Sequence, residues 1–171
     1  MSACLWTDID DYLYTTITAQ MGAASAYDTL KVRQVVIDEV WGLDEAKKNN
    51  KFPLVLIFSD SSEIEPGGHG GGNVRFANTY TYRLVSVTMT DIGKRQCKRE
   101  SKEMRRRLRE VLRYGMTPGA SSFGALASTD GERFKNIEYG PAEIQIFGRA
   151  DQDTGTYYGV TWQDFRILTE G

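Results

Sequence analysis

Residues 79–89 read Thr-Tyr-Thr-Tyr-Arg-Leu-Val-Ser-Val-Thr-Met, and this stretch predicts the central strand of the fold. Large apolar side chains alternate with smaller or polar ones, first on one face of the expected strand and then on the other: Tyr80, Tyr82 and Leu84, followed by Val85, Val87 and Met89. Because successive side chains of a strand point to opposite faces, each face is apolar over part of its length. We therefore expect a central strand that other elements cover in part on both faces.

The segment after this strand predicts a long basic helix from about Gly93 to Tyr114. Asp91 is placed to cap its start, and Gly115 is placed to end it. Small or apolar residues recur along it every three or four positions: Cys97, Ser101, Met104, Leu108 and Val111 or Leu112. This narrow stripe predicts that one face of the helix packs on a core while charged side chains occupy the rest.

The chain has 171 residues and a formal net charge of −2, but its charges are strongly segregated. Residues 94–113 hold ten Lys and Arg against three Glu, a balance of +7, which leaves −9 for the remainder. We expect the basic residues of this helix to form a subunit or partner interface: Lys98, Arg99, Lys102, Arg105, Arg106, Arg109 and Arg113. Since residues 105–107 are three consecutive arginines, they point around most of the helix, and at least one is expected near another subunit or near the acidic remainder.

Three interpretations of this basic helix stay open. Its cations form ion pairs within or between subunits, or they are a solvated face with local pairs such as Arg99 with Glu103, or they bind nucleic acid phosphates. Nucleic-acid-binding domains usually have a basic isoelectric point and an aromatic or helix-turn-helix reading element. Here the isoelectric point is about 5.5 and the helix has only Tyr114 as an aromatic residue, so ion pairing is favoured.

The remaining sequence predicts two further helices and four further strands. They are a helix over 8–20, a strand over 32–38, a short helix over 43–48, and strands over 52–58, 142–148 and 156–168. The last strand changes its apolar face, which predicts a bulge near Gln163 and Asp164. Residues 151–155 are expected to form the hairpin turn before it.

Two segments, 59–78 and 116–135, are expected to be long irregular loops. The order of elements then predicts a single α+β domain over residues 1–171. We expect a mostly antiparallel sheet, with the N-terminal helix and the long basic helix packed on one face.

Composition argues against membrane and secreted classes. The longest apolar run, 54–58, is far shorter than the ~20 residues that span a bilayer, and the N-terminus is acidic where a signal peptide is basic. Cys4 and Cys97 suit a reducing compartment and lack the close Cys or His neighbours that zinc sites need. A chain of this length buries about 70% of the surface that its unfolded state exposes, so we expect a core without disulfides or metal.

The candidate catalytic and ligand-binding motifs each lack residues that the chemistry requires. The glycine-rich residues 66–72 lack the Lys and Ser or Thr of a phosphate-binding loop, and His69, the single histidine, lies among glycines that cannot hold an imidazole in place. Residues 151–155 depart from a calcium loop at its fifth position, Gly155, and turn chemistry explains them better. We expect no catalytic, metal or cofactor site. Four residues of the first long loop are candidate contacts: Asp60, Glu63, Glu65 and His69.

The layout of the chain resembles that of tail terminator (tail completion) proteins of long-tailed bacteriophages. The features that carry the resemblance are the N-terminal helix with Tyr12 and Leu13, the strand over 52–57, the strand over 80–87 leading into the helix over 94–113, and the closing strand over 157–162. The resemblance implies a structural virion protein, made in the host cytoplasm, that forms a homo-hexameric ring on the last ring of the tail tube protein and joins the tail to the head–tail connector. Other neck, head-completion and minor capsid proteins share related layouts and stay open.

Three functions are carried forward. The first is a structural ring subunit without catalysis, because the +7 segment and the −9 remainder offer the two complementary patches that a head-to-tail ring needs. The second is a nucleic-acid-binding module that uses the basic helix. The third, with the least support, is an enzyme with an acidic site around Asp60, Glu63 and Glu65.

Overall fold

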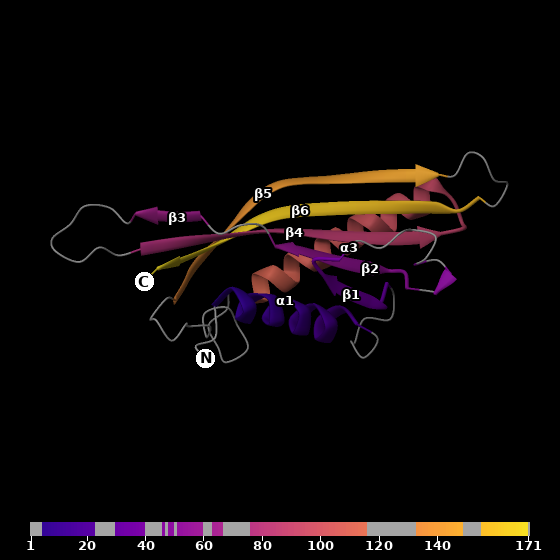
Figure 1. The fold of residues 1–171 in the computed structure, drawn as a ribbon. Coiled ribbons are helices and arrows are strands. Elements are labelled where there is room, and N and C mark those ends of the chain that lie inside the picture. The colour runs from indigo at the N-terminus through magenta and orange to yellow at the C-terminus, as the bar shows by residue number, and fades with distance from the viewer. Residues whose placement is uncertain are drawn as a thin grey trace.

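A computed structural model describes residues 5–22, 30–39, 46, 48–49, 51–59, 63–66, 76–115, 133–148 and 155–170 of the chain. Within these residues, two long helices and a six-stranded sheet are arranged as Figure 1 shows. The elements in chain order are α1 (Leu5–Met21), β1 (Gln34–Ile37), β2 (Leu54–Ser59), β3 (Glu63–Pro66), β4 (Phe76–Thr90), α3 (Lys94–Gly115), β5 (Arg133–Gly148) and β6 (Tyr157–Glu170).

The strands follow the order β1-β2-β4-β6-β5, and β3 pairs with the first residues of β4. β1 and β2 are parallel, and every other pairing among the described strands is antiparallel. The predicted α+β class with a mostly antiparallel sheet is therefore confirmed. As predicted, β4 is the central strand, because it pairs with β2 and β3 along one side and with β6 along the other.

The N-terminal helix is confirmed as α1, which begins three residues before the predicted start at residue 8. The helical spacing of Ile9, Tyr12 or Leu13, Ile17 and Met21 predicts the buried face of this helix. Ile9, Leu13, Ile17 and Met21 are each at most 1% exposed, and Tyr12 is half-buried. The amide of Gly22 donates a hydrogen bond to the Thr18 carbonyl at 2.9 Å, which closes the last turn.

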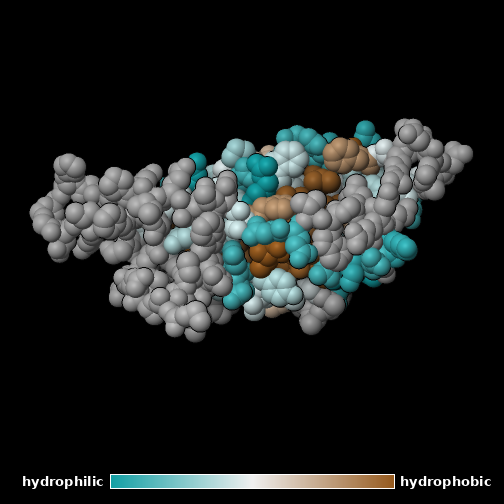
Figure 2. All heavy atoms as spheres, viewed as in Figure 1, coloured by the Kyte–Doolittle hydropathy of each residue, from teal (hydrophilic) through white to brown (hydrophobic). Residues whose placement is uncertain are grey.

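The sheet has apolar side chains on both faces, as the alternation along β4 predicts. On one face, Tyr80, Tyr82 and Leu84 pack in a core cluster with buried residues of α1 and α3. On the other face, Val87 belongs to a second cluster with β1, β2 and β6, against which Val85 and Met89 pack in part. Figure 2 views this second face, where apolar residues gather over the middle of the sheet.

The prediction of an irregular segment over 59–78 is wrong at two places, where the structure has strands. Residues 63–66 form β3, and β4 begins at Phe76, three residues before the predicted start. The two strands pair from Glu63 opposite Thr79 to Pro66 opposite Phe76. Glutamate and proline are poor strand formers, and pairing with the long neighbouring strand overrides their preference here.

The second predicted irregular segment, 116–135, is wrong over its last residues, because β5 begins at Arg133 and not at residue 142. The pairing of β5 with β6 shifts register between Phe134 and Asn136 and again between Tyr139 and Ala142. These irregularities admit Gly140 and Pro141 into a long strand, which is why the sequence did not predict it.

The bulge predicted near Gln163 and Asp164 is not in β6, which pairs with β4 without a shift from Leu168 to Tyr157. The irregularity at this place belongs to the neighbouring β5, between Tyr139 opposite Phe165 and Ala142 opposite Gln163. The change of apolar face along β6 needs no bulge, since strict alternation places Tyr158 and Phe165 on opposite faces and both faces are covered. Residues 151–154 of the predicted hairpin turn lie outside the described residues, as does most of the short helix predicted over 43–48.

Candidate functional site

The buried stripe of α3 is the one that its sequence predicts. Its members are all at most 6% exposed: Cys97, Ser101, Met104, Leu108, Val111 and Leu112. Near the start of the helix, Ser101 donates to the Cys97 carbonyl at 2.8 Å and its hydroxyl lies 3.2 Å from the Thr88 hydroxyl of β4. These contacts join the first half of α3 to β4, while the whole buried stripe turns the opposite side of the helix toward solvent.

Most of the basic residues selected from the sequence lie on the exposed part of α3. Lys98, Arg99, Lys102, Arg106, Arg109 and Arg113 are exposed, and Arg105 is half-buried. The structure therefore brings the predicted interface residues onto one helix surface that faces away from the core.

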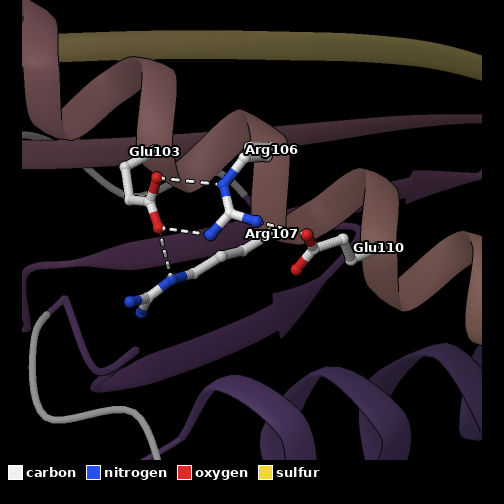
Figure 3. A network of polar contacts seen from close by, with 4 residues as sticks. All are labelled: Glu103, Arg106, Arg107 and Glu110. Atoms are coloured by element: carbon white, nitrogen blue, oxygen red, sulfur yellow. Dashed lines mark hydrogen bonds and ion pairs between the residues drawn. The ribbon is translucent and has the colours of Figure 1, made fainter.

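Arg106 lies in a local network of ion pairs, which Figure 3 shows from close by. Its guanidinium pairs with Glu103 at 2.7 Å and also with Glu110, one turn further along the helix. The hydrogen bonds from Arg106 hold the pKa of Glu103 below its ordinary value, against the opposing effect of burial. Two carboxylates thus already neutralise Arg106, so it offers less net charge to a partner than its neighbours on the helix do.

Arg107, in contrast, is a basic residue of the core-facing side and is only 5% exposed. Its Nε donates to Glu103 at 3.2 Å (Figure 3). The sequence predicts that Arg105, Arg106 and Arg107 point around most of the helix, and it offers Arg99 as a local partner of Glu103. The pairs that the structure gives Glu103 are to Arg106 and Arg107. The burial of Arg107 could have been predicted from the sequence, because position 107 lies three residues after Met104 and four before Val111, beside the buried stripe.

A groove of about 860 Å³ runs between the second half of α3 and β5. Its lining is basic on the helix side and aromatic or aliphatic on the strand side: Lys102, Arg105, Arg106, Arg109, Glu110 and Arg113, with Tyr139 and Ile144. We call this feature the α3–β5 groove. It joins cationic and apolar surface in one concave site, which is the composition of a recognition surface for an acidic partner with apolar side chains.

Two contacts define the geometry of the α3–β5 groove. Arg109 donates through Nε to the Gln163 side chain of β6 at 3.0 Å, and Gln163 in turn donates to the Gly140 carbonyl of β5 at 3.0 Å. Tyr139 is 45% exposed, and burial of the remainder raises the pKa of its hydroxyl while Arg109 and Arg113 oppose that rise. The phenol therefore lies within the electrostatic reach of two arginines of the helix.

Of the four candidate contact residues of the first predicted loop, the structure describes two, and only their backbone. Asp60 and His69 lie outside the described residues, and Glu63 and Glu65 belong to β3, whose backbone is described. Among the described residues, no group of three or more His, Cys, Asp or Glu is placed to hold a metal ion.

No helix in the part of the chain that the structure describes is long and apolar enough to cross a membrane. Comparison with models of known protein families and with curated proteins finds no match for this chain.

Proposed function

We propose that this chain is a structural subunit of a long-tailed bacteriophage virion, a tail terminator that forms a ring on the tail tube and joins the tail to the head connector. The observation that carries the proposal is the exposure of the basic residues of α3 on a chain whose remainder has a balance of −9. A subunit with two different complementary surfaces associates head to tail, and such contacts close into a ring when the rotation between subunits permits it.

The proposal takes α3 as a long basic helix packed on the same face of the sheet as α1. Support comes from the core cluster in which buried residues of both helices pack with β4 and β6. The order of elements supports it too, since the α+β layout with a central β4 leading into α3 is the layout on which the resemblance depends. Other neck or head-completion proteins are the nearest alternatives within the same class.

The test is native mass spectrometry of the nuclease-treated protein over a concentration series, followed by electron microscopy of tail tubes to which the protein is added. The proposal expects a nucleic-acid-free hexamer, or a monomer that forms a ring only at the end of the tube. A protein that neither forms a ring nor caps tubes would contradict it.

A charge-reversed variant makes this test specific to α3. Arg105→Glu together with Arg109→Glu is expected to abolish ring formation while the subunit stays folded, because both side chains line the α3–β5 groove. Arg106 is left unchanged, since a third carboxylate beside Glu103 and Glu110 would disturb the helix itself. Tube capping by the variant at wild-type efficiency would show that charge docking through this helix is not used.

A nucleic-acid-binding module is the second candidate, favoured by the exposure of Lys98, Arg99 and Lys102 on consecutive turns of α3. It predicts binding to DNA or RNA that weakens steeply as salt concentration rises, because cations that contact phosphates release counterions. Absence of binding at low salt, measured by fluorescence polarisation with a labelled oligonucleotide, would eliminate this candidate.

A further inference from the structure

Within the described part of the chain, the side of β5 that is turned toward α3 has no helix over it. Ala142 of β5 lies opposite Gln163 of β6, whose side chain accepts a hydrogen bond from Arg109 of α3, so the register places Ala142 on that side. Ile144 follows on the same side, and both it and Tyr139 line the α3–β5 groove. Ala142 and Ile144 are half-buried and Tyr139 is exposed. The strand therefore presents apolar surface that the rest of the described fold does not cover.

α3 itself packs one place nearer the middle of the sheet, over β4 and β6. Ser101 of the helix lies 3.2 Å from Thr88 of β4 and directly on Gly159 of β6. Helices that pack side by side have axes about 8–10 Å apart, which is about two strand spacings. A further helix beside α3, on the side away from β2, would therefore lie over β5. The groove of about 860 Å³ lies at that position.

The side of α3 that lines this groove carries a row of cations. Arg105, Arg109 and Arg113 follow one another at intervals of four residues, and Lys102 lies in the same groove. Among the described residues, none of these four side chains forms an ion pair, whereas the neighbouring Arg106 pairs with two glutamates. The row therefore keeps its positive charge available to a partner.

The spacing of the arginine row fits a second helix. Residues four apart in a helix are separated by about 6 Å along the axis, because the rise is about 1.5 Å per residue. A helix that lies alongside α3 has the same rise, so acidic residues four apart on it can each meet one arginine of the row. A strand added at the edge of the sheet would instead lie beside β5 and leave its apolar side uncovered. A helix is therefore favoured over a strand.

The apolar part of the groove favours a polypeptide over a nucleic acid. Nucleic acids bind cationic grooves through their phosphates and stack their bases on aromatic side chains. Tyr139 is the single aromatic residue among the described residues of the lining, and Ile144 offers no aromatic ring for stacking. A helix with one apolar stripe and one acidic side uses both parts of the groove, which is the usual way in which amphipathic helices are recognised.

We propose that the α3–β5 groove is the docking site of an acidic amphipathic helix from a partner protein. The helix lies beside α3 on β5. Its apolar stripe contacts Tyr139 and Ile144, and acidic residues four apart contact Arg105, Arg109 and Arg113. The inference rests on the proposed function in taking this groove as the surface through which α3 docks, and it describes the partner at that surface by its chemistry.

A pair of synthetic peptides tests the charge of the partner. The first is an alanine-based peptide of about 20 residues with Leu every three or four positions and Glu one position after each Leu, and the second has Lys in place of Glu. Wild type is expected to bind the Glu peptide at least about 30-fold more tightly than the Lys peptide, and R105E/R109E is expected to show the opposite preference. Fluorescence anisotropy with labelled peptides and the full chain measures binding, and circular dichroism verifies folding.

Two further variants test where the peptide lies. R95E/R99E changes the charge of α3 equally at exposed positions outside the groove lining. Arg99 is about 9 Å along the axis from Arg105, beyond the screening length of about 8 Å at 0.15 M salt, so affinity within about 3-fold of wild type is expected. Ile144→Ser is expected to weaken binding about 5–10-fold through lost apolar contact. Loss in R95E/R99E equal to that in R105E/R109E, or wild-type affinity of Ile144→Ser, would overturn the placement.

A proline at the centre of the Glu peptide tests its conformation. Because proline breaks a helix, this peptide is expected to bind at least about 30-fold more weakly. Equal binding would indicate an extended ligand and overturn the helix. A single-stranded oligonucleotide is the last probe: if it binds wild type but not R105E/R109E while the Glu peptide does not bind, the groove is a nucleic-acid site and the inference is wrong.

The outcomes separate the inference from the proposed function. If the wild type forms rings or caps tubes but does not bind the Glu peptide at millimolar concentration, the helix site is wrong while the ring stands. If the peptide binds with the expected preferences but the protein neither forms rings nor caps tubes, the ring is wrong and the helix site stands.

Discussion

The Ser101 hydroxyl of α3 occupies the space that a side chain on Gly159 of β6 would need, because a Cβ at position 159 would lie 1.8 Å from Ser101 Oγ. The Thr88 hydroxyl would lie 2.8 Å from the same Cβ. Helix and sheet approach each other more closely here than any residue except glycine permits. The contact sets how closely α3 approaches the sheet at this point.

Gly159→Ala is expected to lower the free energy of unfolding by about 1–3 kcal/mol, because the added methyl overpacks the contact between α3 and β6. Urea denaturation measures the change. Adding Ser101→Gly is expected to recover part of the loss, since it removes the nearest atom while Thr88 stays. Wild-type stability of Gly159→Ala would mean that the helix does not approach the sheet so closely.

Arg107→Ala is expected to cost about 1–3 kcal/mol of folding free energy, because the side chain is only 6% exposed and packs its stem in the core-facing side of α3. Arg106→Ala is the matched control one residue earlier. Its side chain is 54% exposed, so its ion pairs with Glu103 and Glu110 contribute less than about 1 kcal/mol. Equal losses in the two variants would contradict the burial of Arg107.

Asp10 of α1 gives the stability a pH dependence. It accepts a hydrogen bond from the Tyr82 hydroxyl at 2.7 Å, and burial raises its pKa above the ordinary value even though that bond opposes the rise. The folded state therefore holds a proton on Asp10 more readily than the unfolded state does. This contribution favours folding most below the unfolded pKa and is lost as pH rises through the window up to the folded pKa.

Asp10→Asn is accordingly expected to remove this pH window while keeping an oxygen that accepts from Tyr82. As pH rises, the free energy of unfolding of the variant increases relative to that of the wild type. The increase is less than about 1 kcal/mol, because the carboxyl is only half-buried. Unfolding by urea between about pH 3 and pH 8 measures it, with Asp11→Asn at the exposed neighbouring position as control. Parallel profiles of wild type and Asp10→Asn would refute the expectation.

Cys97 is expected to be unreactive in the folded protein. Its thiol is fully buried under α3, and burial raises its pKa, so little thiolate is available at neutral pH. In a Cys4→Ser variant, a thiol reagent such as dithionitrobenzoate should report the rate of unfolding, with a full equivalent released only in denaturant. Complete reaction of the native protein within seconds would place Cys97 at the surface.

Local patterns in the sequence determined much of this fold. The helical spacing of Ile9, Tyr12 or Leu13, Ile17 and Met21 determined α1. The alternation of apolar side chains over residues 79–89 determined the central strand with cover on both faces. These periodicities report burial directly, because a helix or strand must turn its apolar face toward a core. The stripe along α3 was determined in the same way.

Features that depend on contacts between residues distant in the sequence were decided only by the tertiary structure. β3, with its Glu and Pro, is a strand because β4 pairs with it, and β5 continues through Gly140 and Pro141 because β6 pairs with both sides of an irregularity. The burial of Arg107 follows from how α3 is rotated on the sheet. The α3–β5 groove arises from strand order, a property of long-range pairing that no local pattern of residues encodes.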